Sequence, residues 1–111
     1  MTVRTLKKKP PLEKDFQRRV LKILREIPDS YWVRFNDRKT FGVPDILGCV
    51  KGRFFALELK RKKNGSYKAT PLQRYHLKKI REAYGEAFIL TPETLGQVLG
   101  ILKTVSNIPK P

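Results

Sequence analysis

The chain has 111 residues, of which 25 are Lys or Arg and 10 are Asp or Glu, giving a formal net charge of +15. This length suits one domain with a single core, and 40% hydrophobic with 32% charged residues argue against a disordered chain. The positive excess predicts a polyanionic partner, most commonly nucleic acid. An anionic membrane is the alternative partner, but the sequence contains no run near the ~20 apolar residues that a membrane span needs.

The first predicted elements are a basic arm, a helix and a strand. The arm covers residues 1–9 and contains no apolar signal segment. Pro10-Pro11 then opens a helix whose apolar residues recur at helical spacing from Leu12 to Ile27. Residues 31–36, rich in aromatic and β-branched side chains, predict a strand, and a polar loop follows it.

The centre of the chain predicts a β-hairpin. Two apolar runs, residues 45–50 and residues 53–60, lie on either side of Lys51-Gly52. If these two residues are the loop, Asp45 stands directly opposite Glu58, with Cβ atoms ~4.5–5.5 Å apart. A four-residue loop keeps this register, whereas a bulge would shift it by one residue.

The last predicted elements are a helix, a short strand and another helix. Thr70-Pro71 supplies an N-cap and a first-turn proline for a helix that Gly85 ends. Residues 87–90 predict a strand. Thr91-Pro92 repeats the cap signal before a helix whose apolar positions reach Leu102.

The resulting order, α-β-β-β-α-β-α, predicts an α/β fold with a mixed central sheet flanked by helices. We expect residues 10–105 to form a single domain. Residues 106–111, rich in proline, are expected to be an irregular tail.

The hairpin brings two acids and a lysine to one patch, since Lys60 lies two residues beyond Glu58 and points the same way. Adjacent carboxylates are unfavourable unless a cation joins them, and Mg²⁺ takes carboxylate oxygens while keeping water positions. Without a cysteine or histidine cluster, Mg²⁺ or Mn²⁺ is favoured over zinc. Lys60 could then act on the attacking water or the phosphate. The structural alternative is a simple ion pair of Lys60 with Glu58 or Asp45.

The segment Gly42-Val43-Pro44-Asp45, followed by Glu58-Leu59-Lys60, resembles the Pro-Asp…Glu-x-Lys motif of the PD-(D/E)XK nuclease superfamily. Within it the chain most resembles the VRR-NUC group, in the short stand-alone form of phages and bacteria, from about Leu12 to Leu102. The resemblance implies a restriction-endonuclease-like αβββαβ core, a two-carboxylate Mg²⁺ or Mn²⁺ site and phosphodiester hydrolysis. It also implies that the backbone carbonyl of Leu59 is a metal ligand.

Glu13 matches the acid that the family places in its first helix, where it completes the metal shell directly or through water. Phe16 and Val20 follow at i+3 and i+7, so Glu13 borders the predicted buried stripe. The alternative is an acid placed in the first turn because it favours the helix dipole.

Gln73 matches the family's helical glutamine, whose role is to support the lysine or the water. Leu77, Ile80 and Tyr84 follow at i+4, i+7 and i+11, so Gln73 shares their expected inward face. A buried glutamine needs partners, and a purely structural hydrogen bond is therefore the alternative.

The remaining positive charge is expected to hold DNA. A basic loop continues past Lys60 as far as Lys68, and such a run beside a cleavage site is well placed for backbone phosphates, although charge runs are often only solvated surface. The candidate DNA-binding residues are Arg34, Arg38, Lys39, Arg61, Lys62, Lys63 and Lys68.

We therefore expect a Mg²⁺- or Mn²⁺-dependent DNA endonuclease. Stand-alone relatives of this type imply branched substrates such as four-way (Holliday) junctions, action as a homodimer, and the cytoplasm of a bacterium or phage-infected host cell. A nicking or flap-directed nuclease is one alternative, and a non-catalytic nucleic-acid-binding protein on the same fold is another. No glycine-rich phosphate loop supports a nucleotide cofactor, and no apolar segment supports a membrane partner.

Overall fold

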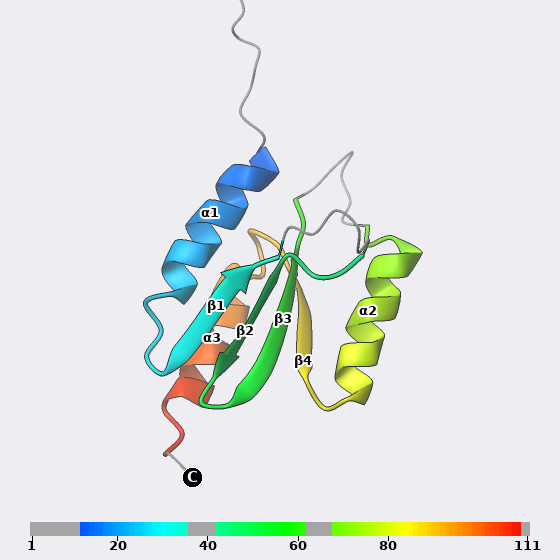
Figure 1. Cartoon of the computed structure of the whole chain (residues 1–111). Helices are drawn as coiled ribbons and strands as arrows, with labels where there is room; N and C mark the ends of the chain where they lie inside the picture. The colour runs from blue at the N-terminus through cyan, green and yellow to red at the C-terminus, as the bar shows by residue number, and fades with distance from the viewer. Residues whose placement is uncertain (1–11, 36–41, 62–67, 110–111) are drawn as a thin grey trace, which may run out of the picture.

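The computed structural model describes residues 12–35, 42–61 and 68–109 (Figure 1). Within them a four-stranded sheet, ordered β1-β2-β3-β4, carries helices on both faces. The predicted order of elements is confirmed. The elements are α1 (Leu12–Leu24), β1 (Ser30–Arg34), β2 (Ile46–Val50), β3 (Arg53–Leu59), α2 (Pro71–Glu82), β4 (Glu86–Leu90) and α3 (Leu95–Ser106).

The sheet is mixed, as predicted. β1, β2 and β3 form an antiparallel meander, and β4 adds parallel to β3. Parallel neighbours need a crossover connection, and α2 provides it. Because α2 returns the chain to the next strand, it lies over β3 and β4 rather than over β1 (Figure 1).

Two cores follow from the period-two alternation of the strands. The larger core lies between the sheet and the helices α1 and α3, and its fully buried residues include Phe16, Val20, Phe55, Leu57 and Leu102. The smaller core lies under α2 and consists of Ala56, Leu77 and Ala87, with Leu47 and Ile80 packed against them. Glu58 follows Ala56 at the next position of that second face, so α2 shelters it.

The predicted hairpin register is confirmed. β2 and β3 pair Val50 with Arg53 and Ile46 with Leu57. Lys51 and Gly52 both have positive φ, at 50° and 83°, as a two-residue primed turn requires. This turn leaves no room for a bulge, so every later position on β3 is fixed relative to β2.

Gly48 has a packing role in the middle of β2. A Cβ added there would lie 2.3 Å from the Trp32 ring and 2.3 Å from the Tyr31 carbonyl oxygen. The missing side chain leaves room for the Trp32 indole beside Gly48, and only 2% of Trp32 is exposed.

The start of α2 is the one predicted, and the start of α3 is not. Thr70 caps α2 in a reciprocal capping box with Gln73. α3 begins at Leu95, whereas Thr91 was expected to cap it. The Thr91 and Thr94 hydroxyls instead accept each other's backbone N–H at 2.9 and 3.1 Å, which closes a separate turn before the helix.

Two further expectations are wrong in detail. α2 ends at Glu82, and Tyr84 then adopts a left-handed conformation (φ 69°), so 94% of the residue is exposed and it does not face inward. α1 ends at Leu24 rather than Ile27, because the N–H groups of Glu26 and Ile27 donate three residues back, to Ile23 and Leu24, in a tighter turn before Pro28, whose ring disfavours helix at the preceding residue. In the described ranges, no helix combines the length and the apolar character needed to cross a membrane.

Candidate active site

Asp45 and Glu58 meet at the end of the hairpin farthest from its turn. Asp45 comes directly before β2, and the pair that follows Ile46–Leu57 in this register is Asp45–Glu58. The Asp45 carboxylate reaches across to β3, where its Oδ2 accepts the backbone N–H of Leu59 at 2.8 Å. Its backbone carbonyl accepts the N–H of Phe35 at 2.8 Å, so both neighbouring strands hold the residue.

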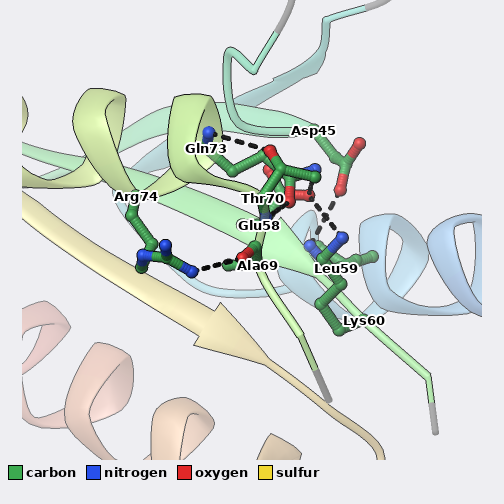
Figure 2. A network of polar contacts seen from close by, with 8 residues as sticks. All are labelled: Asp45, Glu58, Leu59, Lys60, Ala69, Thr70, Gln73 and Arg74. Atoms are coloured by element: carbon green, nitrogen blue, oxygen red, sulfur yellow. Dashed lines mark hydrogen bonds and ion pairs between the residues drawn. The ribbon is translucent and has the colours of Figure 1, made fainter. Parts of the chain in front are cut away.

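Glu58 is a buried acid with 2% of its surface exposed. Its Oε2 accepts a hydrogen bond of 2.9 Å from Gln73 Nε2 and lies 3.9 Å from the Lys60 ammonium (Figure 2). A charge removed from water is costly unless polar or charged partners compensate it. The position of Glu58 on the α2 face supplies these partners.

Gln73 joins the site to the start of α2. Its Oε1 accepts the backbone N–H of Thr70 at 2.8 Å, and its own N–H donates to Thr70 Oγ1 at 3.1 Å. Because the amide oxygen is engaged by a donor, the NH₂ group is the end that faces the carboxylate of Glu58, which can only accept. Both readings drawn from the sequence thus apply to one side chain: it makes a structural hydrogen bond and contacts a candidate catalytic acid.

Lys60 follows β3 directly and keeps to the face of Glu58. Its backbone N–H donates to the Leu90 carbonyl at 2.9 Å, which extends the pairing with β4 by one residue. The side chain is 18% exposed, so the ammonium lies in a partly sheltered position. The 3.9 Å separation from Glu58 is a loose ion pair, which is the contact that the structural alternative anticipates. It also keeps the ammonium beside any phosphate that approaches Glu58.

The chemistry of the donors fits a hard divalent cation. Asp45 and Glu58 offer carboxylate oxygens, the ligand type that Mg²⁺ and Mn²⁺ prefer. Among the described side chains, no third Asp, Glu, His or Cys joins them in a metal-binding group. A full shell therefore needs water, the Leu59 carbonyl or Glu13. Glu13 belongs to α1, but its side chain lies outside the described part of the structure.

The described candidates for DNA binding take different places. Lys68 is exposed and starts the segment that enters α2. The Arg61 guanidinium lies 6.0 Å from the centre of the Phe16 ring, so this side chain turns toward α1. Arg34 pairs with Ile46, whose side chain is in the larger core, so the register places Arg34 on the opposite face of the sheet from Glu58. The other candidates lie outside the described residues: Arg38, Lys39, Lys62 and Lys63.

Arg74 also lies near these residues, and the sequence alone does not indicate it. Arg74 Nη1 donates to the Ala69 carbonyl at 2.6 Å, which holds the guanidinium beside the segment that enters α2 (Figure 2). Arg74 is exposed and follows Gln73 in the helix, so no apolar periodicity marks it. Its place depends on how α2 packs against the sheet, although the capping-box spacing Thr70-x-x-Gln73 was a usable signal for the turn beneath it.

Comparison of the sequence with protein-family models and with curated proteins finds no match. Among solved structures, the chain is similar to a protein described as a "VRR_NUC domain protein", with a TM-score of 0.66 and 15% sequence identity. The similarity covers 92% of this chain and 93% of that chain. At this identity the likeness concerns the fold. The fold expected from the VRR-NUC resemblance, a restriction-endonuclease-like mixed sheet flanked by helices, is confirmed.

Proposed function

We propose that this chain is a metal-dependent DNA endonuclease of the PD-(D/E)XK type, within the VRR-NUC group. The observation that carries the proposal is the convergence of Asp45, Glu58 and Lys60 at one end of the hairpin. The shared fold with a VRR_NUC domain protein supports a nuclease. The formal net charge of +15 supports a nucleic acid as the substrate, because phosphate contacts dominate such binding.

The residues divide the chemistry among them. Asp45 and Glu58 would hold Mg²⁺ or Mn²⁺, with the Leu59 carbonyl and Glu13 as further ligands. When bound, the ion supplies positive charge to the phosphoryl oxygens and makes water a better nucleophile. Lys60 orients the water or neutralises the charge that develops on the phosphate. Gln73 holds one oxygen of Glu58 and so fixes the orientation of that carboxylate.

The proposed substrate is branched DNA, such as a four-way junction, and the proposed assembly is a homodimer. A symmetric junction needs two strands cut, and a two-fold dimer supplies two active sites in matching orientation. Sedimentation velocity at micromolar concentration, with and without junction DNA, tests the assembly. A monomer under both conditions would contradict it.

The activity is tested by incubating the protein with a four-way junction, a flap and a linear duplex of matched sequence. We expect cleavage of the junction with Mg²⁺ or Mn²⁺, none in EDTA, and binding with little hydrolysis in Ca²⁺, whose geometry is looser. Faster cleavage of the flap or a nick in the duplex would reassign the substrate. DNA binding without cleavage in the presence of each of these ions would indicate a non-catalytic nucleic-acid-binding protein instead of an enzyme.

Two isosteric changes test the site itself. Asp45→Asn and Glu58→Gln should each lower the cleavage rate by orders of magnitude and preserve DNA affinity, which the basic surface supplies. Asp29→Asn and Glu86→Gln are matched controls, because they make the same chemical changes near the hairpin turn. Asp29 and Glu86 form ion pairs there with Lys51 and Arg53. Wild-type cleavage by either site variant would show that the site is misplaced.

A further inference from the structure

A hollow of about 600 Å³ lies beside the carboxylate site, where the chain enters α2. Its floor includes Ile89, the register partner of Glu58 on β4, so the two backbones are one strand spacing apart, about 4.8 Å. Its wall includes Thr70, which is bonded to Gln73 and through it to Glu58. The hollow is therefore a direct neighbour of the proposed cleavage site. The described residues that line it are Lys68, Ala69, Thr70, Pro71, Arg74 and Ile89.

The lining has two chemical characters. Ala69, Pro71 and Ile89 give it an apolar surface, and 37% of Ile89 is exposed there. Lys68 and Arg74 give it two cations, and none of the described residues that line it is acidic. The hydrogen bond of 2.6 Å from Arg74 to the Ala69 carbonyl holds the guanidinium beside the segment that enters α2 (Figure 2). A fixed guanidinium is well suited to a phosphate, whereas a bare ion would gain nothing from the apolar floor.

We propose that this hollow binds one nucleotide of the DNA strand, the immediate neighbour of the nucleotide at the carboxylates. Arg74 and Lys68 contact its phosphate, and Ile89 and Pro71 contact its sugar. The volume falls within the range of about 300–1,000 Å³ that is usual for small-molecule sites. This inference rests on the proposed function, and it adds to the site a phosphate contact, Arg74, on a helix rather than in the basic loop.

Binding measured in EDTA tests the hollow without any chemistry. Arg74→Gln should weaken DNA binding by about threefold to tenfold and reduce the log–log salt slope by about one. Arg74→Lys should recover the slope but only part of the affinity, because it keeps the charge and loses the planar fork. Arg81→Gln is the matched control, since Arg81 is also an arginine of α2 that donates to a backbone carbonyl, that of Ala87, at 2.7 Å.

A scan with single uncharged methylphosphonate linkages identifies the contact. At one position, the neutral linkage should weaken binding by the wild-type protein more than binding by the Arg74→Gln variant, because the variant has already lost one of the two contacts to that phosphate. The Lys68→Gln variant should also lose less affinity than the wild type when the linkage at this same position is neutral. The inference is overturned if the losses add at every position, or if Arg74→Gln and Arg81→Gln have equal effects.

Cleavage by the same wild-type preparation in Mg²⁺ separates the two proposals. Non-additive losses of affinity without any cleavage would support the nucleotide site and contradict the proposed nuclease activity. Cleavage together with additive losses of affinity would support the nuclease activity and contradict the nucleotide site.

Discussion

The Gln73 side chain makes two hydrogen bonds, and the backbone N–H of Gln73 donates a third to Thr70 Oγ1. Its Oε1 accepts the Thr70 N–H at 2.8 Å, and its Nε2 donates to the buried Glu58 at 2.9 Å. Gln73→Ala removes both bonds. Thr70→Ala removes only the hydroxyl that accepts the Gln73 N–H, and leaves the contact with Glu58 in place. The two variants therefore differ mainly in what happens to the buried carboxylate.

The expected magnitudes follow from these contacts. Thr70→Ala should lower the free energy of unfolding by about 1 kcal/mol, the usual cost of losing an N-cap side chain. Gln73→Ala should lower it by about 2.5–4 kcal/mol, because it removes a neutral hydrogen bond worth ~1 kcal/mol and a bond to a charged group worth ~1.5–3 kcal/mol. In a domain of roughly this size, each kcal/mol shifts Tm by about 4–8 °C.

Gln73→Glu adds a sharper contrast. A glutamate also completes a capping box, so the start of α2 keeps its bond. The donor to Glu58 is replaced by a second carboxylate, and the repulsion should destabilise the fold in EDTA. Saturating Mn²⁺ should then restore more stability to Gln73→Glu than to Gln73→Ala, since bound cations stabilise the folded state by linkage.

Urea denaturation followed by circular dichroism, in EDTA and in Mn²⁺, measures all three variants. If Gln73→Ala cost no more than Thr70→Ala, the contact with Glu58 would carry no free energy. The assignment of Gln73 as a support of the site would then fall.

Other changes have effects that follow from the structure or, for Lys62 and Lys63, from the sequence alone. Gly48→Ala should destabilise the protein by about 3 kcal/mol, because the new methyl overpacks against the buried Trp32 indole. Gly96→Ala places its methyl where nothing lies within 4 Å, and it should stabilise α3 by up to about 1 kcal/mol. Equal Tm values for the two variants in thermal melts would contradict both expectations. Lys60→Ala should depress single-turnover cleavage at saturating DNA and leave affinity nearly unchanged. Lys62→Ala with Lys63→Ala should weaken DNA binding and flatten its salt dependence. If Lys60→Ala lost only affinity in a salt series and the double variant lost only cleavage rate, the roles assigned to these lysines would be reversed.

The centre of the site could be predicted because its geometry follows from local rules. A two-residue turn at Lys51-Gly52 fixes the register of the hairpin, and the period of two then puts Asp45, Glu58 and Lys60 on one face. None of these steps requires knowledge of where a distant segment packs. The capping of α2 by Thr70 is local in the same sense.

The errors arose where a nearby polar group or a distant contact changed the outcome. Thr91 matches the pattern of a helix cap, but its hydroxyl and backbone N–H form hydrogen bonds with Thr94, three residues later. These bonds close a turn, and the helix begins only after it. Tyr84 followed the apolar periodicity of α2, yet the helix ended before it. Arg74 gave no signal at all, because its position beside Ile89 exists only once α2 has packed across β4.

Glu58 shows why local rules also point to function at this position. It stands in a strand whose residues from Phe55 to Leu59 are all buried, where an apolar residue would pack at lower cost. The fold retains the acid and surrounds it with Gln73, Lys60 and the nearby Asp45. Departures from the burial rule are expected at functional sites, where local stability is exchanged for chemistry. A Glu58→Leu variant that unfolds at higher urea concentration than the wild type, and cuts no DNA, would be the direct signature of that exchange.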